Sequence, residues 1–483
     1  MEENLKNKTI FGLMWSAVGK VGTLTINFLS NLVLARLLMP EDFGSIAMLA
    51  IFLAVSNIFI QGGLGSALIQ KKNPTKADYS TVFYWNLTFA ALFYALLFFT
   101  APLVAGYYDL PPLKPLLRAQ SVVLIIQSFA IVQITQLQKQ MNFRALAIRN
   151  IAAAMAGTLV AIPMAFAGFG AWSLVVSAIT SAIVNVILLW RMSSWRPSWE
   201  FSFASLKELF SFGGLMLLSS LTETIYTNLQ GLIIGKRFSA GDLGYFSQAK
   251  KLEEIPVTGL SSIVNDVTFP AFSTLQDDTE KLLAGVRKSA KALVYVNFPM
   301  MVLLMIIAKP FITLLYGAKW EPSVPYFQIL CLSGLVYTLN TLNTNVIKSL
   351  GKGSVYFVLQ ISKRIIGIGL IIFGIRYGVM GLLYAVASVS YISFVINAVA
   401  NKKLINYGLL SQVKDFLPAL AVTAVAGLAA YAFSFIDMNI YVLMCVQICI
   451  FAVVFFVLSK LLKIDGFQTY YSVIQNFIKR KRS

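Results

Sequence analysis

The chain has 483 residues, of which 58% are hydrophobic and 12% are charged, and its formal net charge is +19. Soluble domains carry about 25% charged residues, so this composition predicts a polytopic membrane protein. The sequence has no histidine, which excludes histidine-based catalytic triads, histidine–zinc sites and imidazole proton relays. The three cysteines all fall in apolar stretches, so we expect no disulfide framework, no metal site and no cofactor.

About fourteen apolar stretches are each long enough to cross a bilayer, for which about 20 residues suffice. They predict an all-α membrane protein with two lobes of six spans and two additional C-terminal spans. The predicted spans cover residues 11–38, 43–70, 79–105, 116–138, 146–167 and 171–191 in the first lobe, residues 212–237, 243–272, 282–307, 326–350, 355–375 and 379–400 in the second, and then residues 416–435 and 441–462.

The first span carries a cation, Lys20, about a third of the way along its length. Ser16, Lys20, Thr23, Asn27 and Asn31 recur at three- and four-residue spacing, which places them on one helical face. A lysine inside the hydrocarbon costs about 3 kcal/mol by insertion scales. We therefore expect this face to line a water-filled pathway and Lys20 to meet a negatively charged substrate. The alternative is a lysine that extends its stem to reach the membrane interface.

Basic loops alternate along the chain with short, nearly neutral ones. The positive-inside rule then places the basic loops and both termini in the cytoplasm, and it explains the net charge without any nucleic acid. The longest external connection, residues 106–115, leaves no room for a catalytic domain, so we do not expect an enzyme. The basic loops are residues 71–76, 139–149, 191–207, 287–291 and 402–403.

The domain organisation follows from these spans. The long internal connection contains Trp195, Trp199 and the amphipathic segment SFASLKELFSF, which together predict an interfacial linker between two lobes. The basic tail ends in four cations, Lys479 to Arg482, and we expect it to lie on anionic cytoplasmic lipid, with a solvated tail as the alternative. The predicted boundaries are residues 1–195 for the first lobe, 196–211 for the linker, 212–405 for the second lobe, 406–465 for the two additional spans and 466–483 for the tail.

A short internal repeat supports two related halves. Residues 35–44 read ARLLMPEDFG, and residues 235–244 read GKRFSAGDLG. A weaker pair is FGAWSL at 169–174 and YGVMGL at 377–382. Because six predicted spans separate the members of each pair, the repeats are parallel, and transporters built in this way usually bind their substrate between the lobes.

The second lobe has polar faces of its own. Asn340 lies on the polar side of the tenth span, and Tyr356, Gln360 and Lys363 share one face of the eleventh span with Arg364 beside them. Ionisable groups in spans are costly, so we expect Lys363 and Arg364 to line a cavity. Two alternatives remain: these side chains bond across helices and hold the bundle together, or the two cations lie at the cytoplasmic rim.

Carboxylates in the spans predict two different roles. Lys250 precedes Glu254 by four residues, a spacing that favours a structural ion pair. Glu223 and Asp266 have no cation close in sequence, so we expect them to be candidates for coupling to H+ or Na+.

Several segments resemble one known family. They are LGYFSQAKKL at 243–252, IPV at 255–257, FPAFS at 269–273, LQDD at 275–278, GAKWEP at 317–322, GLGSALIQ at 63–70 and STVFYWN at 80–86. With them the chain resembles, over nearly its whole length, the polysaccharide transporter (lipid-linked oligosaccharide flippase) family, and within it the colanic-acid-exporter-like branch. This family belongs to the multidrug, oligosaccharidyl-lipid and polysaccharide exporter superfamily.

The resemblance implies two six-helix lobes around a central cavity that works by alternating access. It implies a cargo of polyprenyl-diphosphate-linked oligosaccharide, moved from the cytoplasmic to the periplasmic leaflet of a bacterial inner membrane for capsule, exopolysaccharide or lipopolysaccharide assembly. The implied partners are membrane lipid, H+ or Na+, and polysaccharide polymerase machinery.

The site assignments rest on the helical stripes, because the resemblance supplies no strict residue motif. Lys and Arg donors suit a diphosphate, so Lys20, Lys363 and Arg364 are its predicted ligands. Sugar hydroxyls need amide and aromatic partners, and the predicted ones are Asn27, Asn31, Asn340, Gln360 and Tyr356.

Two other function classes would each require features that differ from those of a flippase. A multidrug cation/proton or sodium antiporter of the same superfamily would require carboxylates in the cavity of the first lobe, where the sequence offers Lys20 instead. A membrane enzyme such as a sugar polymerase or ligase would require a large external loop, and none is predicted.

Overall fold

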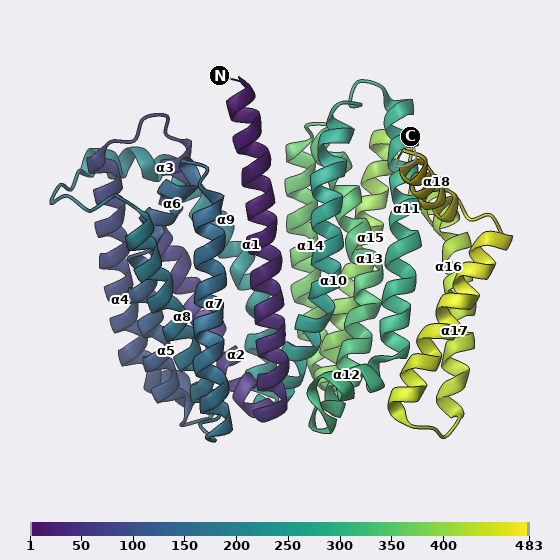
Figure 1. The fold of residues 1–483 in the computed structure, drawn as a ribbon, viewed down its shortest axis with the longest axis horizontal. Helices are drawn as coiled ribbons and strands as arrows, with labels where there is room; N and C mark the ends of the chain where they lie inside the picture. Colours follow the sequence, from purple (N-terminus) through teal and green to yellow (C-terminus); the bar gives the residue numbers. More distant parts are fainter. Residues whose placement is uncertain (1, 481–483) are drawn as a thin grey trace. The chain divides into compact units, whose positions relative to one another are not determined.

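The computed structural model describes residues 2–480, and within that range it is helical and has no β-strand (Figure 1). The chain divides into two compact units, one ending at Gly244 and the other beginning at Tyr245.

The first unit is built on four main helix pairs. α7 packs against both α1 and α8, α4 packs against α5, and α2 packs against α9. Its helices are α1 (Glu2–Leu37), α2 (Pro40–Gln61), α3 (Leu64–Gln70), α4 (Lys76–Tyr108), α5 (Leu113–Ser128), α6 (Ile131–Lys139), α7 (Phe143–Phe166), α8 (Ala171–Met192), α9 (Phe203–Arg237) and the beginning of α10 (Ala240–Ser273).

The second unit is organised around α11 and α13. α13 packs against α15 and α11, and α16 packs against α11 and α17. Its elements after α10 are α11 (Thr279–Ile306), α12 (Ala308–Tyr316), η1 (Ala318–Ser323), α13 (Val324–Ser349), α14 (Gly353–Gly374), η2 (Ile375–Tyr377), α15 (Gly378–Ile405), α16 (Leu409–Ala432), η3 (Phe433–Phe435), α17 (Ile440–Leu461) and α18 (Asp465–Arg480).

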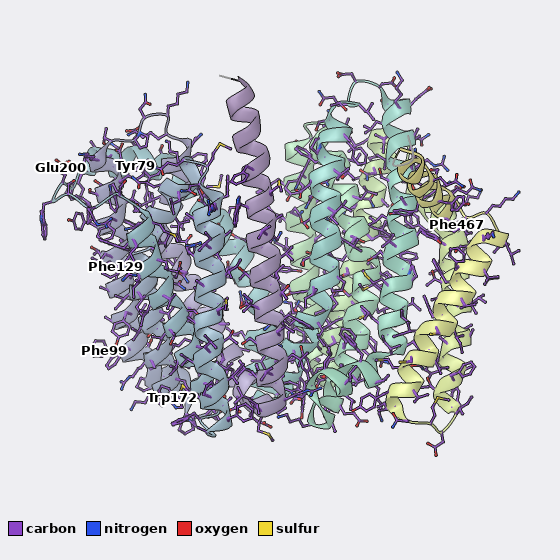
Figure 2. The ribbon with its side chains drawn as sticks, viewed as in Figure 1. Tyr79, Phe99, Phe129, Trp172, Glu200 and Phe467 are labelled. Atoms are coloured by element: carbon purple, nitrogen blue, oxygen red, sulfur yellow. The ribbon has the colours of Figure 1, made fainter. Side chains whose placement is uncertain are left out.

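Ten helical segments of the described chain are long and apolar enough to cross a membrane, or eleven if the bent pair α5 and α6 forms one span. Large apolar side chains are exposed on these helices: Phe99 on α4 is 76% exposed and points outward (Figure 2), as expected where a helix meets lipid. The chain is therefore a multi-pass, all-helical membrane protein, as the composition predicts.

Local chemistry explains where the predicted spans are interrupted. The predicted second span, residues 43–70, is divided into α2 and α3 at Gly62 and Gly63, whose φ angles of 55° and 68° favour glycine. The predicted fourth span, residues 116–138, is bent by 41° between α5 and α6. The segment SFASLKELFSF lies at the start of α9, which runs on without a break into the predicted seventh span.

The aspartates of the internal repeat cap two helices in the same way. Asp42 Oδ2 accepts from the Met39 N–H at 2.9 Å at the start of α2, and Asp242 Oδ2 accepts from the Ser239 N–H at 3.2 Å at the start of α10. These bonds satisfy backbone donors that a helix start leaves without an intrahelical acceptor. Asp42 also accepts from the Ala171 N–H at 2.8 Å, which ties α2 to the start of α8.

The glycines of the repeat contact the opposite copy reciprocally. A Cβ atom on Gly44 would overlap the carbonyl oxygen of Ala240, and a Cβ atom on Gly244 would overlap the carbonyl oxygen of Pro40. All four residues belong to the first unit. Both positions therefore require glycine, since any other side chain would force the two helix starts apart.

We predict that Gly244→Ala lowers the free energy of unfolding by about 1–3 kcal/mol, because the new methyl group has no space beside Pro40. The matched control on the same helix is Gly259→Ala, since a Cβ atom on Gly259 would meet nothing within 4 Å. Alanine there should leave stability unchanged or raise it by about 0.5–1 kcal/mol. Thermal unfolding of the purified protein in detergent measures both variants, and equal stabilities would contradict the overlap.

Candidate functional site

Lys20 projects from α1 on a face that helix packing leaves open. α1 packs on α7 through its glycines: a Cβ atom on Gly19 would lie 2.7 Å from Ala147 Cβ, and one on Gly22 would lie 3.0 Å from Ile151 Cδ1. Lys20 lies about 100° further round the helix than Gly19 and is exposed. The close approach of α7 to the glycine face thus leaves the lysine beside it uncovered.

The rest of the predicted α1 stripe changes from exposed to buried along the helix. Ser16 and Asn27 are exposed, Thr23 is half-buried and Asn31 is buried. Exposed apolar residues, including Val18 and Val21, occupy another face of the same helix. α1 therefore presents one polar face and one apolar face to its surroundings within the first unit.

A second cationic stripe lies on α14 in the second unit. Tyr356, Gln360, Lys363 and Arg364 are all half-buried, and Gly367, one turn beyond Lys363, is buried. The Lys348 ammonium lies 4.9 Å from the centre of the Tyr356 ring, a cation–π contact at the start of this stripe. The helix brings these four predicted site residues onto neighbouring faces, so each unit carries a cationic stripe of its own.

Asn340 is occupied by helix packing. Its Nδ2 donates to the Ser390 carbonyl at 3.0 Å, and its Oδ1 accepts from Asn397 Nδ2 at 2.8 Å. Both partners lie on α15. Asn340 therefore holds α13 to α15. This is the structural role that the sequence analysis gives as the alternative to sugar binding.

The predicted coupling carboxylates are not enclosed. Glu223 on α9 and Asp266 on α10 are both exposed. The predicted pair of Lys250 and Glu254 is confirmed, with 3.7 Å between Nζ and Oε1. Its neighbour Glu253, by contrast, is only 8% exposed. The sequence prediction did not single out Glu253. Glu253 precedes the buried Val257 by four residues and the buried Ser261 by eight, a spacing that indicates a shared buried face.

Arg149 is a second buried charge that the sequence prediction did not single out. The sequence predicts it at the end of the basic loop 139–149, but the structure places it nearly two turns into α7, where it is 8% exposed. Its Nε and Nη1 atoms have no hydrogen-bond partner within residues 2–480. Small residues at Ala145 and Ala153, four positions away on each side, are the signal for this packed face.

Lys71 has a structural role in the first basic loop. Its ammonium bonds Glu208 at 2.9 Å at the start of α9 and the buried Asp78 at 3.0 Å at the start of α4. The hydrogen bond that the Lys71 ammonium donates to Glu208 is the main cause that raises the pKa of Lys71 above its ordinary value. The adjacent Lys72 is exposed in the loop, which makes it a suitable control for the spans.

A charge cluster ties the C-terminal helices to α11. The Arg287 guanidinium makes two 2.8 Å bonds to the Asp415 carboxylate on α16, and Lys291 bonds Asp465 at 2.7 Å at the start of α18. Tyr407 OH donates to Asp415 at 3.0 Å, and burial raises the pKa of that hydroxyl. Paired in this way, these cations stabilise helix packing.

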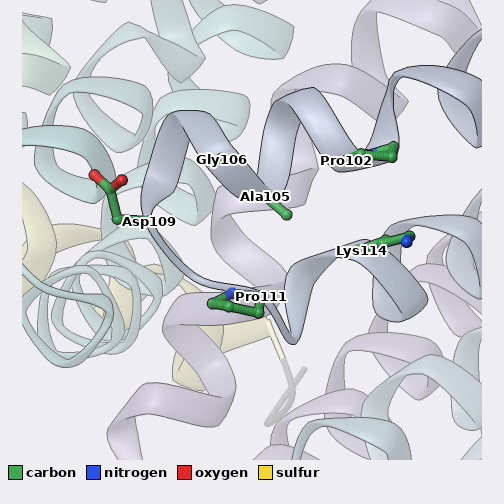
Figure 3. A pocket seen from close by; sticks show the side chains of 6 residues that line it. All are labelled: Pro102, Ala105, Gly106, Asp109, Pro111 and Lys114. Atoms are coloured by element: carbon green, nitrogen blue, oxygen red, sulfur yellow. The ribbon is translucent and has the colours of Figure 1, made fainter.

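A surface pocket at the corner between α4 and α5 contains none of the predicted site residues (Figure 3). Its charged lining residues are Asp109 and Lys114, and the Asp109 carboxylate bonds Lys236 at 3.0 Å. The remaining lining is Pro102, Ala105, Gly106 and Pro111. The pocket therefore belongs to the short connection between helices.

Comparison with solved structures identifies the fold. The solved structure of the lipid II flippase MurJ, in an inward closed conformation, matches with a TM-score of 0.76 at 15% identity, over 93% of this chain and 98% of that one. An inward-facing multidrug resistance MATE family transporter of the MOP superfamily matches with a TM-score of 0.59 at 15% identity, over 82% of this chain and 100% of that one.

Sequence comparison identifies the family. The model of the family described as "Polysaccharide biosynthesis protein" matches residues 33–325, more than half of the chain, so the chain belongs to this family. The lipopolysaccharide biosynthesis protein WzxC of Escherichia coli K12 is 26% identical over 77% of this chain and 76% of its own length. The succinoglycan biosynthesis transport protein ExoT of Rhizobium meliloti is 29% identical over 74% and 73%. The resemblance to polysaccharide transporters is confirmed.

We predict that the polar face of α1 meets water and its apolar face meets lipid. In a variant whose three native cysteines are replaced, Lys20→Cys should react with a membrane-impermeant maleimide in vesicles opened to both sides. Val21→Cys, which is 63% exposed on a neighbouring face, should remain unlabelled because hydrocarbon excludes the charged reagent. Equal labelling of the two cysteines would contradict a water-lined stripe.

Proposed function

We propose that the protein is a flippase for polyprenyl-diphosphate-linked oligosaccharide, moved from the cytoplasmic to the periplasmic leaflet of the bacterial inner membrane by alternating access. Its product would feed the assembly of capsule, exopolysaccharide or lipopolysaccharide by polysaccharide polymerase machinery. The observation that carries the proposal is the family match together with relatives such as ExoT, whose name couples succinoglycan biosynthesis to transport. The MurJ-like fold agrees with it.

The cationic stripes suit a diphosphate. A diphosphate spreads its charge over several oxygens, for which lysine and arginine are strong hydrogen-bond donors. Lys20 on α1 and Lys363 and Arg364 on α14 are the proposed ligands. The proposed sugar contacts are Asn27, Asn31, Gln360 and Tyr356, and Asn340 in a state that frees its amide from α15.

We further propose fourteen spans, arranged as two six-helix lobes around a central cavity with two C-terminal spans. The apolar region Gly353–Ile405 would be about 80 Å long as one helix, more than twice the hydrocarbon thickness, and η2 divides it into α14 and α15. α10 and α13 are long enough to span and are set apart only by their polar residues. Counting them, and α5 with α6 as one span, supports an even number with both termini in the cytoplasm.

The main alternative is a multidrug cation/proton or sodium antiporter, which the MATE-like fold leaves open. A binding site for organic cations requires carboxylates inside the spans. Between α1 and α8, all the carboxylates lie in or beside the first or last turn of a helix: Glu2, Glu3, Glu41, Asp42, Asp78 and Asp109. The distribution of charge therefore favours an anionic cargo. Coupling of the flippase to H+ or Na+ is part of the proposal, with Glu223 and Asp266 as its exposed candidates.

We predict that Lys20→Gln reduces the rate of lipid flipping at least about tenfold, because a charge-assisted bond to the diphosphate is lost. The assay follows a fluorescent polyprenyl-diphosphate oligosaccharide in proteoliposomes at matched protein levels. Lys20→Arg should retain most of the rate, and Lys72→Gln in the exposed loop should retain all of it. Unchanged flipping by Lys20→Gln would leave Lys20 with a structural role.

The proposed topology predicts that a green fluorescent protein fused after Ser483 fluoresces and that alkaline phosphatase fused at the same place is inactive. A fusion of alkaline phosphatase between Asp109 and Leu113, at the corner between α4 and α5, should be active because that corner would be periplasmic. The reverse pattern of activities would overturn the proposed orientation.

A further inference from the structure

One carboxyl group in the second unit is buried without an ion pair among the described residues. Glu253 on α10 makes no hydrogen bond and no ion pair within the part of the chain that the structure describes, although it is only 8% exposed. Lys250 lies three residues before Glu253 in the sequence, but its ion pair is with Glu254. An unpaired carboxylate in a low-dielectric interior is strongly unfavourable, so this position needs an explanation.

A glycine on α13 makes the space that Glu253 occupies. A Cβ atom on Gly334 would lie 3.0 Å from Glu253 Oε1, 3.2 Å from Val257 Cγ2 and 2.8 Å from the sulfur of Met301 on α11. Three helices, α10, α11 and α13, therefore meet around this carboxyl group. Further along, Asn345 Nδ2 on α13 donates to Thr268 Oγ1 on α10 at 3.0 Å, so α10 and α13 run in the same direction along one seam.

Three more oxygen atoms along this seam are buried without a hydrogen-bond partner within residues 2–480. They are Ser261 Oγ on α10, Thr338 Oγ1 on α13 and Asn297 Oδ1 on α11. Ser261 follows Glu253 by eight residues and Thr338 follows Gly334 by four, so both lie on the seam faces of their helices.

The geometry of these oxygens differs from ordinary helix packing. Asn297 Nδ2 donates to the carbonyls of Gly334 and Leu335, at 3.2 Å and 2.8 Å, which fixes the amide and leaves its oxygen without a donor. Hydroxyl groups in spans commonly donate to the carbonyl four residues earlier, as Thr268 does at 2.7 Å. Ser261 and Thr338 do not make that bond. Their oxygens remain available to a ligand.

We propose that this seam binds a monovalent cation at Glu253. Beside Gly334, the Glu253 carboxylate and the Asn297 amide oxygen form a hard, oxygen-only set with a single negative charge, and the Thr338 and Ser261 hydroxyls continue the polar lining one and two turns further along their helices. That set matches Na+ held by the oxygens, or a proton carried by the carboxyl group, and either one neutralises Glu253. The role of the site in transport rests on the proposed flippase function, for which it is a buried candidate site for the coupling ion beside the exposed Glu223 and Asp266. The binding itself does not depend on that function.

The charged and titratable surroundings allow this assignment. They are Lys250, Lys251 and Glu254 on α10 itself and Cys331 on α13. α11 faces Gly334 with Asn297 and Met301, neither of which titrates. With Lys250 and Glu254 paired to each other, Glu253 is the group whose charge the bound cation neutralises.

The test uses the purified full-length protein and its thermal unfolding, which requires no cargo. At pH 8, replacing choline in the buffer by Na+ at constant ionic strength should raise the melting temperature of the wild type by at least about 2 °C. Glu253→Gln should lose this shift. Glu254→Gln, one residue away and exposed, should keep it. This result assigns the site to Na+.

If Na+ has no effect on the wild type, the proton is tested between pH 8 and pH 5. Protonation removes the cost of a buried unpaired charge, so the wild type and Glu254→Gln should gain stability relative to Glu253→Gln as the pH falls. Should Glu253→Gln fail to fold, Glu253→Asp replaces it, because a carboxylate drawn back by one methylene should weaken the response several-fold. Equal responses of the Glu253 and Glu254 variants to both Na+ and pH would overturn the proposal. Flipping of the cargo that does not depend on Na+ or on pH would show that the cation site plays no part in the proposed flippase function.

Discussion

Hydrocarbon solvates neither a charged side chain nor a backbone N–H or C=O group that lacks a hydrogen-bond partner. The placement of nearly every polar group in this chain follows from that constraint. Many polar residues cap helix ends, as Asp42 and Asp242 do. Others bond across helices: Asn343 on α13 donates to Gln412 on α16 at 3.0 Å. What remains is a small set of groups with neither solution, including Lys20, Arg149 and Glu253. For two of these positions, Lys20 and Glu253, we propose a ligand.

Close approach of helices is the second constraint, and glycine satisfies it. Gly44 and Gly244 permit two helix starts to meet, Gly19 and Gly22 permit α7 to pack on α1, and Gly334 makes room for a carboxyl group. Glycine thus stabilises helix packing in the first two cases, and in the third it makes the space for a buried polar group. The internal repeat has its physical reason here, because both copies place glycine where the carbonyl of the other copy must fit.

Much of the fold could be predicted from the sequence, since a span of about 20 apolar residues is a strong and local signal. The α1 stripe was visible because its polar residues share one face, and the structure leaves Lys20 exposed. The burial of Glu253 and the use of Asn340 between helices could not be predicted, because both depend on which helix packs against which face. Arg149 was missed for the same reason: charge near a helix start looks like a basic loop until α7 is seen to begin at Phe143.

The central claim is that the cargo is an anionic lipid-linked oligosaccharide. It is tested most directly by reconstituting the wild-type protein in vesicles and measuring two transport activities in the same preparation. One is the flipping of a fluorescent polyprenyl-diphosphate oligosaccharide, and the other is the uptake of a fluorescent organic cation. The account predicts flipping of the lipid and no transport of the cation, with little flipping of the same lipid after its phosphates are removed. Transport of the cation without flipping of the lipid would contradict the account and identify an antiporter.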